Sequence, residues 1–377
     1  MPHILETYRQ YFPYLKSGHI YFNHASVSPM STFVTNKLRD FITLRSEGVI
    51  DDYMMVMKTA DTVRRQLAAL LHTTEDRFAF GDNTSNGLNL LAQGLRLTHG
   101  DEIILNDLEF PSNVYPFLNL EGDGVKITYA KSHNGIVTAE DIINCISPAT
   151  RLVSVSLVQF LTGYRINLKT LTDYCKPRGI LVCVDTIQGL GGVQMDLTET
   201  PVDFIASGVQ KWMMGPMGFS FIYVTKELQK RLHPRYVGWL SVKNAWNLLD
   251  FKLDLRNDAA AFQNGTMNVM GLMGFSGALE LFDVTGAQNR EKIILDNTEY
   301  LIAKLSELGY KPFMQNVPRE NLAGIITFHP ANGQEIFNHL QSKNITCSLR
   351  EGMIRFSPHF YNTREEIDLV IQELKTL

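Results

Sequence analysis

The stretch that decides the fold reads DFIASGVQKWMMGPMGFSFIYV and runs from Asp203 to Val224. Residues 202–206 and 219–224 are apolar runs with the length and composition of short buried strands. The loop between them contains the glycines and the proline of a tight turn, together with one lysine, Lys211. Because a lysine is usually solvated on a polar face, its position between two core strands indicates a role in chemistry. A structural or solvated lysine is the alternative when Lys211 is taken alone.

Strand-like and helical periods alternate through the first two thirds of the chain, on the N-terminal side of this stretch. Near-continuous apolar strands separated by helices predict a mainly parallel sheet that is covered on both faces, so the fold class is α/β. The predicted strands lie at 102–105, 125–129, 152–158 and 180–184, and the predicted helices lie at 59–72, 83–95 and 167–176.

The pattern changes after about Leu253, where longer helical periods lead into shorter strand-like runs. The closing segment TREEIDLVIQELKTL begins with a capping box formed by Thr363 and Glu366. We therefore predict a large domain of residues 21–253 and a small C-terminal α+β domain of residues 254–377. Helical periods in the small domain lie at 269–281 and 289–308, and strand-like runs lie at 324–328, 345–348 and 353–356.

Length, charge and cysteine content limit the classes of function. A chain of 377 residues is long for one core, and its net charge of -4 makes nucleic acid an unexpected partner. No apolar run has the length of a membrane span, and the N-terminus lacks the pattern of a signal peptide. The four cysteines form no C-x-x-C pair and no zinc-site spacing, so we expect a cytoplasmic protein without a metal.

Asp185 ends the apolar run of ILVCVDTIQGLGG, just as Lys211 follows its own strand. Ligands of open α/β sheets bind beyond the carboxyl ends of the strands, where both side chains are expected to lie. A lysine and an aspartate at one sheet edge suit pyridoxal phosphate, whose aldehyde binds the amine and whose ring nitrogen needs a carboxylate. Taken alone, Asp185 could instead be a helix N-cap or a surface carboxylate.

Two further segments fit such a cofactor. In FGDNTSNGLNLL, Asn83, Thr84 and Ser85 stand where a helix begins, and free backbone N–H groups there can bind a phosphate. Ordinary N-capping explains the same residues equally well. In NDLEFPSNVYP, Phe110 follows a strand and could stack on a planar ring, although core packing is the commoner role of a phenylalanine.

At this point the chain resembles fold-type I pyridoxal-phosphate enzymes of the class V aminotransferase group. That group includes cysteine desulfurases, isopenicillin N epimerase-like proteins and kynureninases. The resemblance implies a large cofactor-binding domain with a mainly parallel seven-stranded-type sheet, and an N-terminal segment of residues 1–20 packed on the small domain. Motifs in the order of the family carry it, namely YFNHASVSP, NTSNGLNLL, EFPSN, VDTIQGLGG, SGVQKW, GPMG, FQNGTMN and IRFSPHFYNT.

The resemblance implies a role for each matching residue. Lys211 would bind the cofactor aldehyde, Asp185 the ring nitrogen, and Arg355 the carboxylate of an amino-acid substrate, for which a guanidinium fork is suited. Phe110 would stack on the ring, with Gln159 and Gln188 beside the cofactor. The phosphate would be held by Thr84, Ser85, Ser207 and Gln210.

Other residues would complete the site from two directions. His24 and Ala25 fall where relatives line the substrate pocket, although a lone histidine near a turn could equally be a satisfied structural residue. Thr266 and Trp239 resemble residues that reach the site of the neighbouring subunit, which implies a homodimer with shared active sites.

One departure from the family bears on the reaction. Desulfurases carry a nucleophilic cysteine on a mobile loop well ahead of the carboxylate-binding arginine, but Cys347 precedes Arg355 by only eight residues (355 − 347). We therefore expect Cys347 to be an inert core thiol, because a reactive cysteine needs partial exposure and positive surroundings.

The predicted function is a pyridoxal-phosphate enzyme acting at Cα of an amino acid, with an isopenicillin N epimerase-like reaction favoured over desulfuration. Transamination, epimerisation and elimination share their first steps and stay open at this point. The alternatives are a kynureninase-like hydrolytic lyase, which has a tyrosine beside its lysine that this chain lacks, and a non-catalytic regulator that binds pyridoxal phosphate. A nicotinamide-dependent oxidoreductase is disfavoured, because GLGG at 189–192 comes late and lacks a third glycine.

Overall fold

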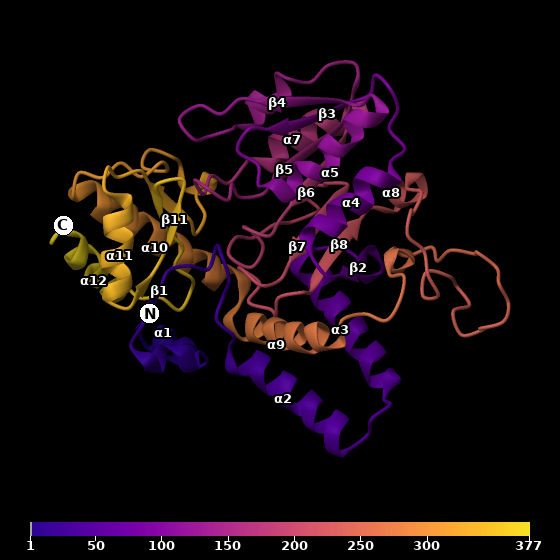
Figure 1. Cartoon of the computed structure of the whole chain (residues 1–377), viewed down its shortest axis with the longest axis horizontal. Coiled ribbons are helices and arrows are strands. Elements are labelled where there is room, and N and C mark those ends of the chain that lie inside the picture. The colour runs from indigo at the N-terminus through magenta and orange to yellow at the C-terminus, as the bar shows by residue number, and fades with distance from the viewer. Residues whose placement is uncertain (1) are drawn as a thin grey trace.

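A seven-stranded sheet forms the centre of the large domain in the computed structural model, which describes residues 2–377 (Figure 1). β8 is antiparallel to both of its neighbours, β2 and β7, whereas the pairs from β7 to β4 are parallel. The prediction of a mainly parallel sheet is therefore confirmed. Its order is β2 (Phe78–Gly81), β8 (Ser220–Val224), β7 (Phe204–Gly208), β6 (Leu181–Asp185), β5 (Thr150–Ser156), β3 (Glu102–Asn106) and β4 (Lys126–Ala130).

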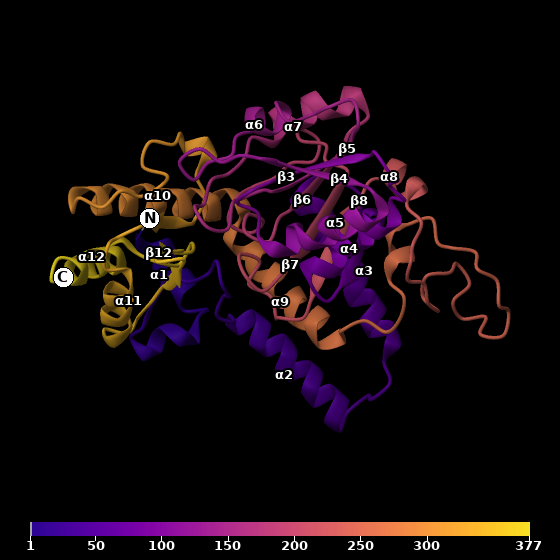
Figure 2. The ribbon, with the colours of Figure 1, turned by 45° about the horizontal axis from the view of Figure 1, so that its top comes forward.

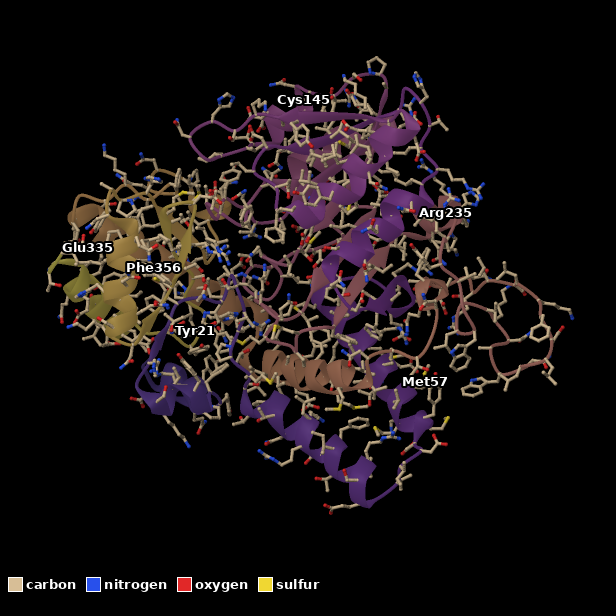
Figure 3. The ribbon with its side chains drawn as sticks, in the orientation of Figure 1. Tyr21, Met57, Cys145, Arg235, Glu335 and Phe356 are labelled. Carbon is tan, nitrogen blue, oxygen red and sulfur yellow. The ribbon has the colours of Figure 1, made fainter. Side chains whose placement is uncertain are left out.

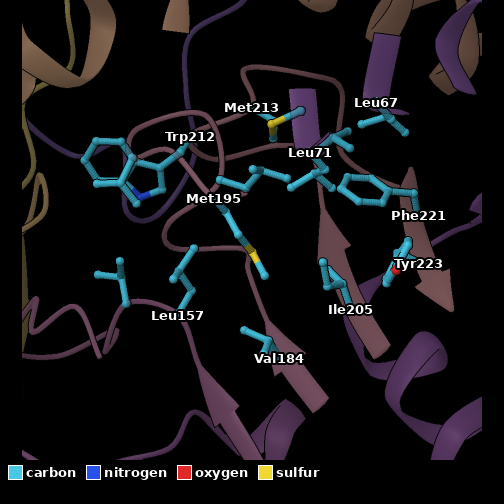
Figure 4. Packing of buried hydrophobic residues seen from close by; sticks show 14 of the residues in the cluster. Leu67, Leu71, Leu157, Val184, Met195, Ile205, Trp212, Met213, Phe221 and Tyr223 are labelled. Carbon is cyan, nitrogen blue, oxygen red and sulfur yellow. The ribbon is translucent and has the colours of Figure 1, made fainter. Parts of the chain in front are cut away.

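Helices cover both faces of this sheet, because successive side chains of each strand enter different cores. In β6, Leu181 and Cys183 pack with the helices α4 (Thr84–Gly94), α5 (Tyr115–Leu118) and α8 (Lys226–Arg231). Val182 and Val184 point the other way, into the core that contains α3 (Tyr53–Leu71), α6 (Ala139–Ile143), α7 (Leu168–Cys175) and α9 (Val269–Thr285). Figure 4 shows Val184 and Ile205 in this second core, beneath Trp212 and Met213 of the lysine loop.

Several elements were not predicted from the sequence, and two of them show why. β2 has only four residues, too few for a recognisable period. The helix α2 (Thr32–Glu47) buries only Val34 of its described side chains, so it has almost no apolar stripe, and its contacts with α9 hold it in place.

The small domain has a core of its own. The three-stranded antiparallel sheet of β11 (Ser348–Arg350), β12 (Met353–Phe356) and β9 (Ile326–Phe328) packs against helices α10 (Ala287–Glu307), α11 (Gly333–Ser342) and α12 (Arg364–Leu374). Thr363 and Glu366 form the predicted capping box of α12. In Figures 1 and 2 this domain lies to one side of the large sheet.

The N-terminal segment contacts both domains, since Arg9 pairs with Glu366 of α12 while Tyr8 and Phe12 pack in the core of the large sheet. The predicted packing of residues 1–20 on the small domain stays a prediction. The helix α1 (Pro2–Arg9) precedes β1 (Ile20–Tyr21), which pairs in parallel with β10 (Ile345–Thr346). Figure 3 labels Tyr21 close to the strands of the small domain, where Phe356 also lies.

The boundary predicted at residues 253 and 254 differs from the structure. The helix α9 lies beyond that point in the sequence, yet its contacts are with α2 and α3, and its buried residues belong to the core of the large sheet. The core of the small domain gains its first residue of α10 at Leu295. The change of pattern near residue 253 therefore lies at the end of the exposed segment rather than at the end of the large core. Within residues 2–377, no helix has the length and apolar character needed to traverse a lipid bilayer.

Candidate active site

Asp185 is the last residue of β6 and is almost fully buried, with 2% of its surface exposed. Its Oδ1 atom accepts a hydrogen bond from the backbone N–H of Ile187 at 2.9 Å. The pKa of this carboxyl group is raised to about 7, mainly by burial and also by the neighbouring charge of Glu109, against the lowering effects of the Ile187 hydrogen bond and of Lys211. The carboxylate form of Asp185 is therefore favoured by any positive charge placed against it.

Lys211 lies in the loop that joins β7 to β8. Its carbonyl oxygen accepts hydrogen bonds from Ser28 Oγ at 2.6 Å and from the backbone N–H of Met214 at 2.9 Å, so the lysine backbone is fixed. Burial lowers the pKa of the Lys211 amine to about 8, Asp185 raises it, and the positive charges of Arg355 and Arg350 lower it. The amine is therefore partly neutral near neutral pH.

Lys211 and Asp185 act on each other through their charges without touching. Among residues 2–377, no hydrogen bond or ion pair within 4.0 Å is formed by the Lys211 Nζ atom with a carboxylate. Opposite charges that are withdrawn from water without being paired are costly, and a polar ring bound to both would satisfy them. The pair therefore fits the cofactor that the sequence predicted.

The residues predicted for the phosphate meet at the start of α4. Asn83 is its N-cap and accepts from the backbone N–H of Asn86 at 2.9 Å, and Thr84 Oγ1 accepts from the backbone N–H of Gly208 at 2.8 Å. A Cβ atom on Gly208 would lie 2.6 Å from Gln210 Oε1 and 3.3 Å from Thr84 Oγ1. The backbone of Gly208 is thus the point where the predicted phosphate residues converge, and only glycine leaves room there.

Two serines complete this cradle. Ser85 Oγ donates a hydrogen bond to Ser112 Oγ at 2.9 Å. Ser207 is fully buried, and its Oγ atom donates to the carbonyl oxygen of Gly208 at 3.2 Å. Hydroxyl groups beside the N-terminus of an 11-residue helix are the donors that a phosphate dianion needs. Capping and anion binding are compatible here, because Asn83 caps the helix and leaves the hydroxyl groups of Thr84 and Ser85 near its first turn.

Phe110 is 41% exposed and is therefore not a core residue. Its ring lies 5.6 Å from Lys211 Nζ and meets the ring of Phe160 edge to face at 5.2 Å. Of the two roles that the sequence left open, the structure excludes core packing and leaves a free aromatic surface beside the lysine.

Arg355 reaches the same place from the small domain. It is 2% exposed, and its Nη1 atom donates to the carbonyl of Phe160 at 2.7 Å while Nη2 donates to Ser26 Oγ at 3.0 Å. Its Nε atom has no partner among the described residues, and no carboxylate of residues 2–377 pairs with it. A buried guanidinium without a counter-ion is ready to bind a carboxylate.

His24 has a role different from the predicted substrate contact. It is fully buried, with Nδ1 at 2.8 Å from the carbonyl of Ser357 and Nε2 at 2.8 Å from the hydroxyl of Tyr361. Burial lowers the pKa of its imidazole to about 3, so the ring is neutral. His24 is thus a satisfied core histidine. Ala25 beside it is buried, and its carbonyl accepts from Gln188 Nε2 at 3.0 Å.

The two glutamines predicted beside the cofactor have their amide groups engaged by the protein. Gln159 Nε2 donates to the carbonyl of Leu108, and its Oε1 atom accepts from the backbone N–H groups of Leu161 and Thr162. Gln188 Oε1 accepts from Trp212 Nε1 at 3.0 Å. These side chains hold the loops around the site, and their contact with the cofactor stays a prediction.

Thr266 and Trp239 lie away from Lys211 within this chain. Thr266 lines a cavity of about 650 Å³ on the flank of α4, whose lining includes Asn86 but not Thr84. Trp239 packs against Trp246, which in turn contacts Tyr53 at the start of α3. One subunit therefore does not bring these two residues to its own site.

Sequence reasoning missed several polar residues that hold the site. Ser26 and Ser348 both approach Arg355 Nη2, although Ser26 lies within the YFNHASVSP motif that the sequence singled out. Glu109, inside the segment that contains Phe110, is held by Asn106, Asn113 and Ser156, and burial raises the pKa of its carboxyl group. The presence of three donors near a buried carboxylate could not be read from spacing along the chain.

Cys347 occupies the position predicted for an inert thiol. It is 4% exposed in the core of the small domain, and burial raises the pKa of its thiol to about 12. The segment between Cys347 and Arg355 forms the tight hairpin of β11 and β12 rather than a mobile loop.

Comparison with known proteins identifies the family. The pattern of the family described as Aminotransferase class-V matches residues 20–370. The chain belongs to this family. It is therefore a pyridoxal-phosphate enzyme, and the family and the cofactor predicted from the motifs are confirmed.

Relatives match over nearly their whole length. An uncharacterized aminotransferase of Bacillus subtilis is 26% identical, over 99% of this chain and 98% of its own. A probable cysteine desulfurase of Methanothermobacter thermautotrophicus is also 26% identical, over 99% of this chain and 98% of its own. These names give no support to the predicted preference for isopenicillin N epimerase over desulfuration.

Solved structures share the fold. The apo cysteine desulfurase of Thermococcus onnurineus superposes with a TM-score of 0.89 at 22% identity, covering 98% of this chain and 97% of that chain. A variant of C-DES with glycine covalently linked to its pyridoxal phosphate gives a TM-score of 0.90 at 23% identity, covering 97% of this chain and 98% of that chain.

Proposed function

We propose that this enzyme removes the Cα proton of an α-amino acid, with the substrate carboxylate on Arg355 and Lys211 as the base. The observation that carries the proposal is the buried guanidinium of Arg355, which has no acidic partner among residues 2–377 and whose charge acts on Lys211. A two-point grip on a carboxylate beside a partly neutral amine is the arrangement that this chemistry needs.

Each group of the site has a separate task in this proposal. When bound, pyridoxal phosphate supplies a ring that accepts electrons from Cα. Asp185 holds a proton on the ring nitrogen by its negative charge, and Thr84, Ser207 and Gln210 hold the phosphate at the start of α4. Phe110 covers the ring with its exposed face. Lys211, with its pKa near 8, takes the Cα proton and can return it.

The position of the thiols limits the steps that can come after proton removal. Cys347 and Cys183 are buried, and burial raises the pKa of the Cys347 thiol to about 12, so neither supplies a thiolate to the site. Cys175 is also buried. Cys145 lies just after α6, and its thiol donates a hydrogen bond to the carbonyl oxygen of Asp141 at 3.4 Å. We therefore propose a reaction that needs no persulfide on a cysteine of this chain.

A second candidate function is β-elimination from a sulfur-containing amino acid. One observation favours it: the solved complex of the cystine C-S lyase C-DES with its reaction product cysteine persulfide has a TM-score of 0.88 to this chain. Elimination leaves the sulfur on the departing group, so it agrees with a site that lacks a thiolate. Epimerisation and transamination need the same residues, and product analysis separates these reactions.

The two other functions considered from the sequence are less favoured. Where kynureninases have a tyrosine beside the lysine, Trp212 is 1% exposed and uses its Nε1 atom to hold Gln188, so it has a structural task. A non-catalytic regulator would not need an uncompensated arginine beside a lysine of lowered pKa.

We further propose that the active unit is a cytoplasmic homodimer. Residues 236–253 form an extended segment at the edge of the molecule (Figure 1) whose apolar side chains are exposed, which is unusual for a monomer. A second subunit covering this segment would bring Thr266 and Trp239 near its site. All four cysteines are free, which agrees with a reducing compartment. The exposed apolar residues are Tyr236, Val237, Trp239, Trp246, Leu248, Leu249, Phe251 and Leu253.

A direct experiment tests the proposed function. The protein purified with pyridoxal phosphate is treated with borohydride, digested and analysed by mass spectrometry, with Lys211→Ala and Lys226→Ala as test and control variants. We expect the reduced cofactor on the peptide of Lys211 in the wild type and in Lys226→Ala, and amino acids to change the cofactor absorption band. A cofactor fixed elsewhere, or a band that no amino acid changes, would remove the proposal.

The products then identify the reaction. Candidate amino acids are screened for a spectral change, and those that respond are assayed for ammonia, sulfide, keto acid, anthranilate and the opposite enantiomer. Sulfide or persulfide together with ammonia would indicate elimination, whereas the enantiomer alone would indicate epimerisation. Anthranilate from kynurenine would restore the kynureninase-like function.

A further inference from the structure

A second arginine, Arg350, lies on the hairpin that carries Arg355. β11 and β12 are joined by Glu351 and Gly352, whose φ angles of 48° and 75° are those of a two-residue hairpin turn with positive φ at both positions. Such a turn fixes the register of the strands, with Ser348 opposite Arg355 and Arg350 opposite Met353. The position of Arg350 is thus set by the hairpin rather than by a flexible loop.

The hairpin directs Arg350 toward the same side as Arg355. Side chains two residues apart on a strand project from the same face, so Arg350 shares a face with Ser348. Ser348 Oγ lies 3.4 Å from Arg355 Nη2 and contacts Asn23, which places this face toward the site. The alternate residue Leu349 packs with the core of the small domain instead.

The positive charge of Arg350 acts on two groups of the site, Lys211 and Arg355. It lowers the pKa of the Lys211 amine and the pKa of the Arg355 guanidinium, although burial is the larger cause for both groups. Across residues 2–377, no carboxylate forms an ion pair with Arg350 and no hydrogen bond from its guanidinium is found. Arg350 is exposed, so an approaching ligand can reach it.

We propose that Arg350 binds a second anionic group, carried by the side chain of the substrate. The inference rests on the proposed function, because it assumes that Arg355 holds the α-carboxylate. Arg350 pairs with Met353, two residues before Arg355, so the two arginines are diagonal neighbours across the hairpin. Such positions are separated by about 7–8 Å, a distance that a carboxylate two to four bonds beyond Cα can span with the help of the long arginine side chains. The substrate class is therefore an α-amino acid whose side chain ends in a carboxylate.

Two acids of equal chain length test this subsite without turnover. Glutarate and pentanoate each have five carbons, but only glutarate has a second carboxylate. Their binding to the cofactor-loaded protein is measured by calorimetry and by the cofactor absorption band, in the wild type, in Arg350→Gln and in Arg39→Gln. Arg39→Gln removes the same charge from the exposed face of α2 and serves as the matched control.

We expect the wild type to bind glutarate about tenfold more tightly than pentanoate, as a charge-assisted contact at an exposed site provides. Arg350→Gln should lose that preference and leave pentanoate binding within about twofold of the wild type, while Arg39→Gln changes neither. Equal binding of the two acids by the wild type, or a preference that survives in Arg350→Gln, would overturn the subsite. Pentanoate has only the carboxylate that Arg355 is proposed to hold, so its binding tests Arg355 alone. If the wild type bound neither acid, the proposed function would fail, whereas a failure of the Arg350 subsite would leave both acids bound equally.

Discussion

At the scale of single residues, the site depends on charges that the protein leaves unpaired. Asp185 is buried and Lys211 is partly buried, and the two act on each other without contact, while Arg355 has no acidic partner among the described residues. Each of these groups costs free energy in the empty site, and each is compensated when a cofactor or substrate of opposite charge binds. The chain thus gives up stability for a site that is already arranged.

The lowered pKa of Lys211 predicts how cofactor binding depends on pH. Only the neutral amine attacks an aldehyde, so the rate at which the cofactor-free protein captures pyridoxal phosphate should rise with pH and level off above about 8. Stopped-flow absorbance gives this profile. In Asp185→Asn the midpoint should move lower, because the carboxylate holds the pKa of the amine up. A midpoint near 10.5, the ordinary value for lysine, would contradict the prediction.

Arg355 predicts a loss of substrate affinity without a loss of cofactor. Arg355→Lys keeps the charge but removes the planar fork, so amino acids should bind about tenfold to a hundredfold more weakly. Spectral titration measures this affinity, and the amount of bound cofactor should stay at the wild-type level. The control is Arg319→Lys, which changes an arginine paired with Asp296 on the small domain. Equal effects in both variants would argue against a specific grip.

The reassignment of His24 is tested through stability. His24→Phe keeps the buried ring but leaves the carbonyl of Ser357 and the hydroxyl of Tyr361 without their partner, at a cost of about 1–3 kcal/mol. Urea unfolding measures this loss. The affinity for amino acids should be close to that of the wild type, and a selective loss of affinity with unchanged stability would return His24 to the substrate pocket.

At the scale of elements, the β11–β12 hairpin sets the positions of residues on which the proposed reaction depends. It replaces the room in which a mobile cysteine loop would lie, buries Cys347 on its far side, and presents Ser348, Arg350 and Arg355 on one face. The turn has two residues with positive φ, Glu351 and Gly352, so the stability of the hairpin depends on how well the side chains at these positions tolerate that conformation.

A matched pair of variants tests the turn. Gly352→Ala places a side chain at a φ of 75° and should destabilise the protein by about 1 kcal/mol, whereas Glu351→Gly relieves a φ of 48° and should be neutral or stabilising. No bulk conflict explains a loss in Gly352→Ala, since the nearest atom to an added Cβ is His329 Nε2 at 3.5 Å. Thermal unfolding separates the two variants, and equal losses would contradict the turn assignment.

At the scale of the whole molecule, one subunit holds Lys211, Asp185 and Arg355 together but leaves Thr266 and Trp239 elsewhere. The proposed dimer makes the site complete and covers the apolar residues of 236–253. Each active site then contains residues of two chains, which has a consequence for mixtures of variants.

Mixing two inactive variants should restore activity. Lys211→Ala removes the base, and Thr266→Asp would set a carboxylate against the phosphate of the partner's cofactor. In randomly mixed dimers of the two variants, half of the dimers are mixed and each has one intact site, so about one quarter of the sites should be active. Turnover after co-refolding or subunit exchange measures this fraction. If all residues acted within one subunit, the mixture would stay inactive.

Much of this protein could be read from the sequence because its signals are local. Apolar runs bounded by turn residues gave the strands β3 to β8, and their positions at strand ends placed Asp185 and Lys211 at one edge of the sheet. The short β2 and the nearly unstriped α2 were missed, because they are held by contacts with distant elements. Spacing along the chain also could not show whether Phe110 and His24 are exposed or buried.

The sequence by itself determined the α/β fold, the family and the cofactor, since each rests on residues close together in the chain or in a fixed order. Only the tertiary structure decided which side chains are free to act. In the folded chain, the amide group of Gln159 and the ring of His24 form hydrogen bonds within the protein. Arg355 has no counter-ion among the described residues, and Cys347 is buried in the core of the small domain. The physical reason is that burial and many hydrogen-bond partners, such as Tyr361, which is 337 residues from His24, are brought together only when the chain folds.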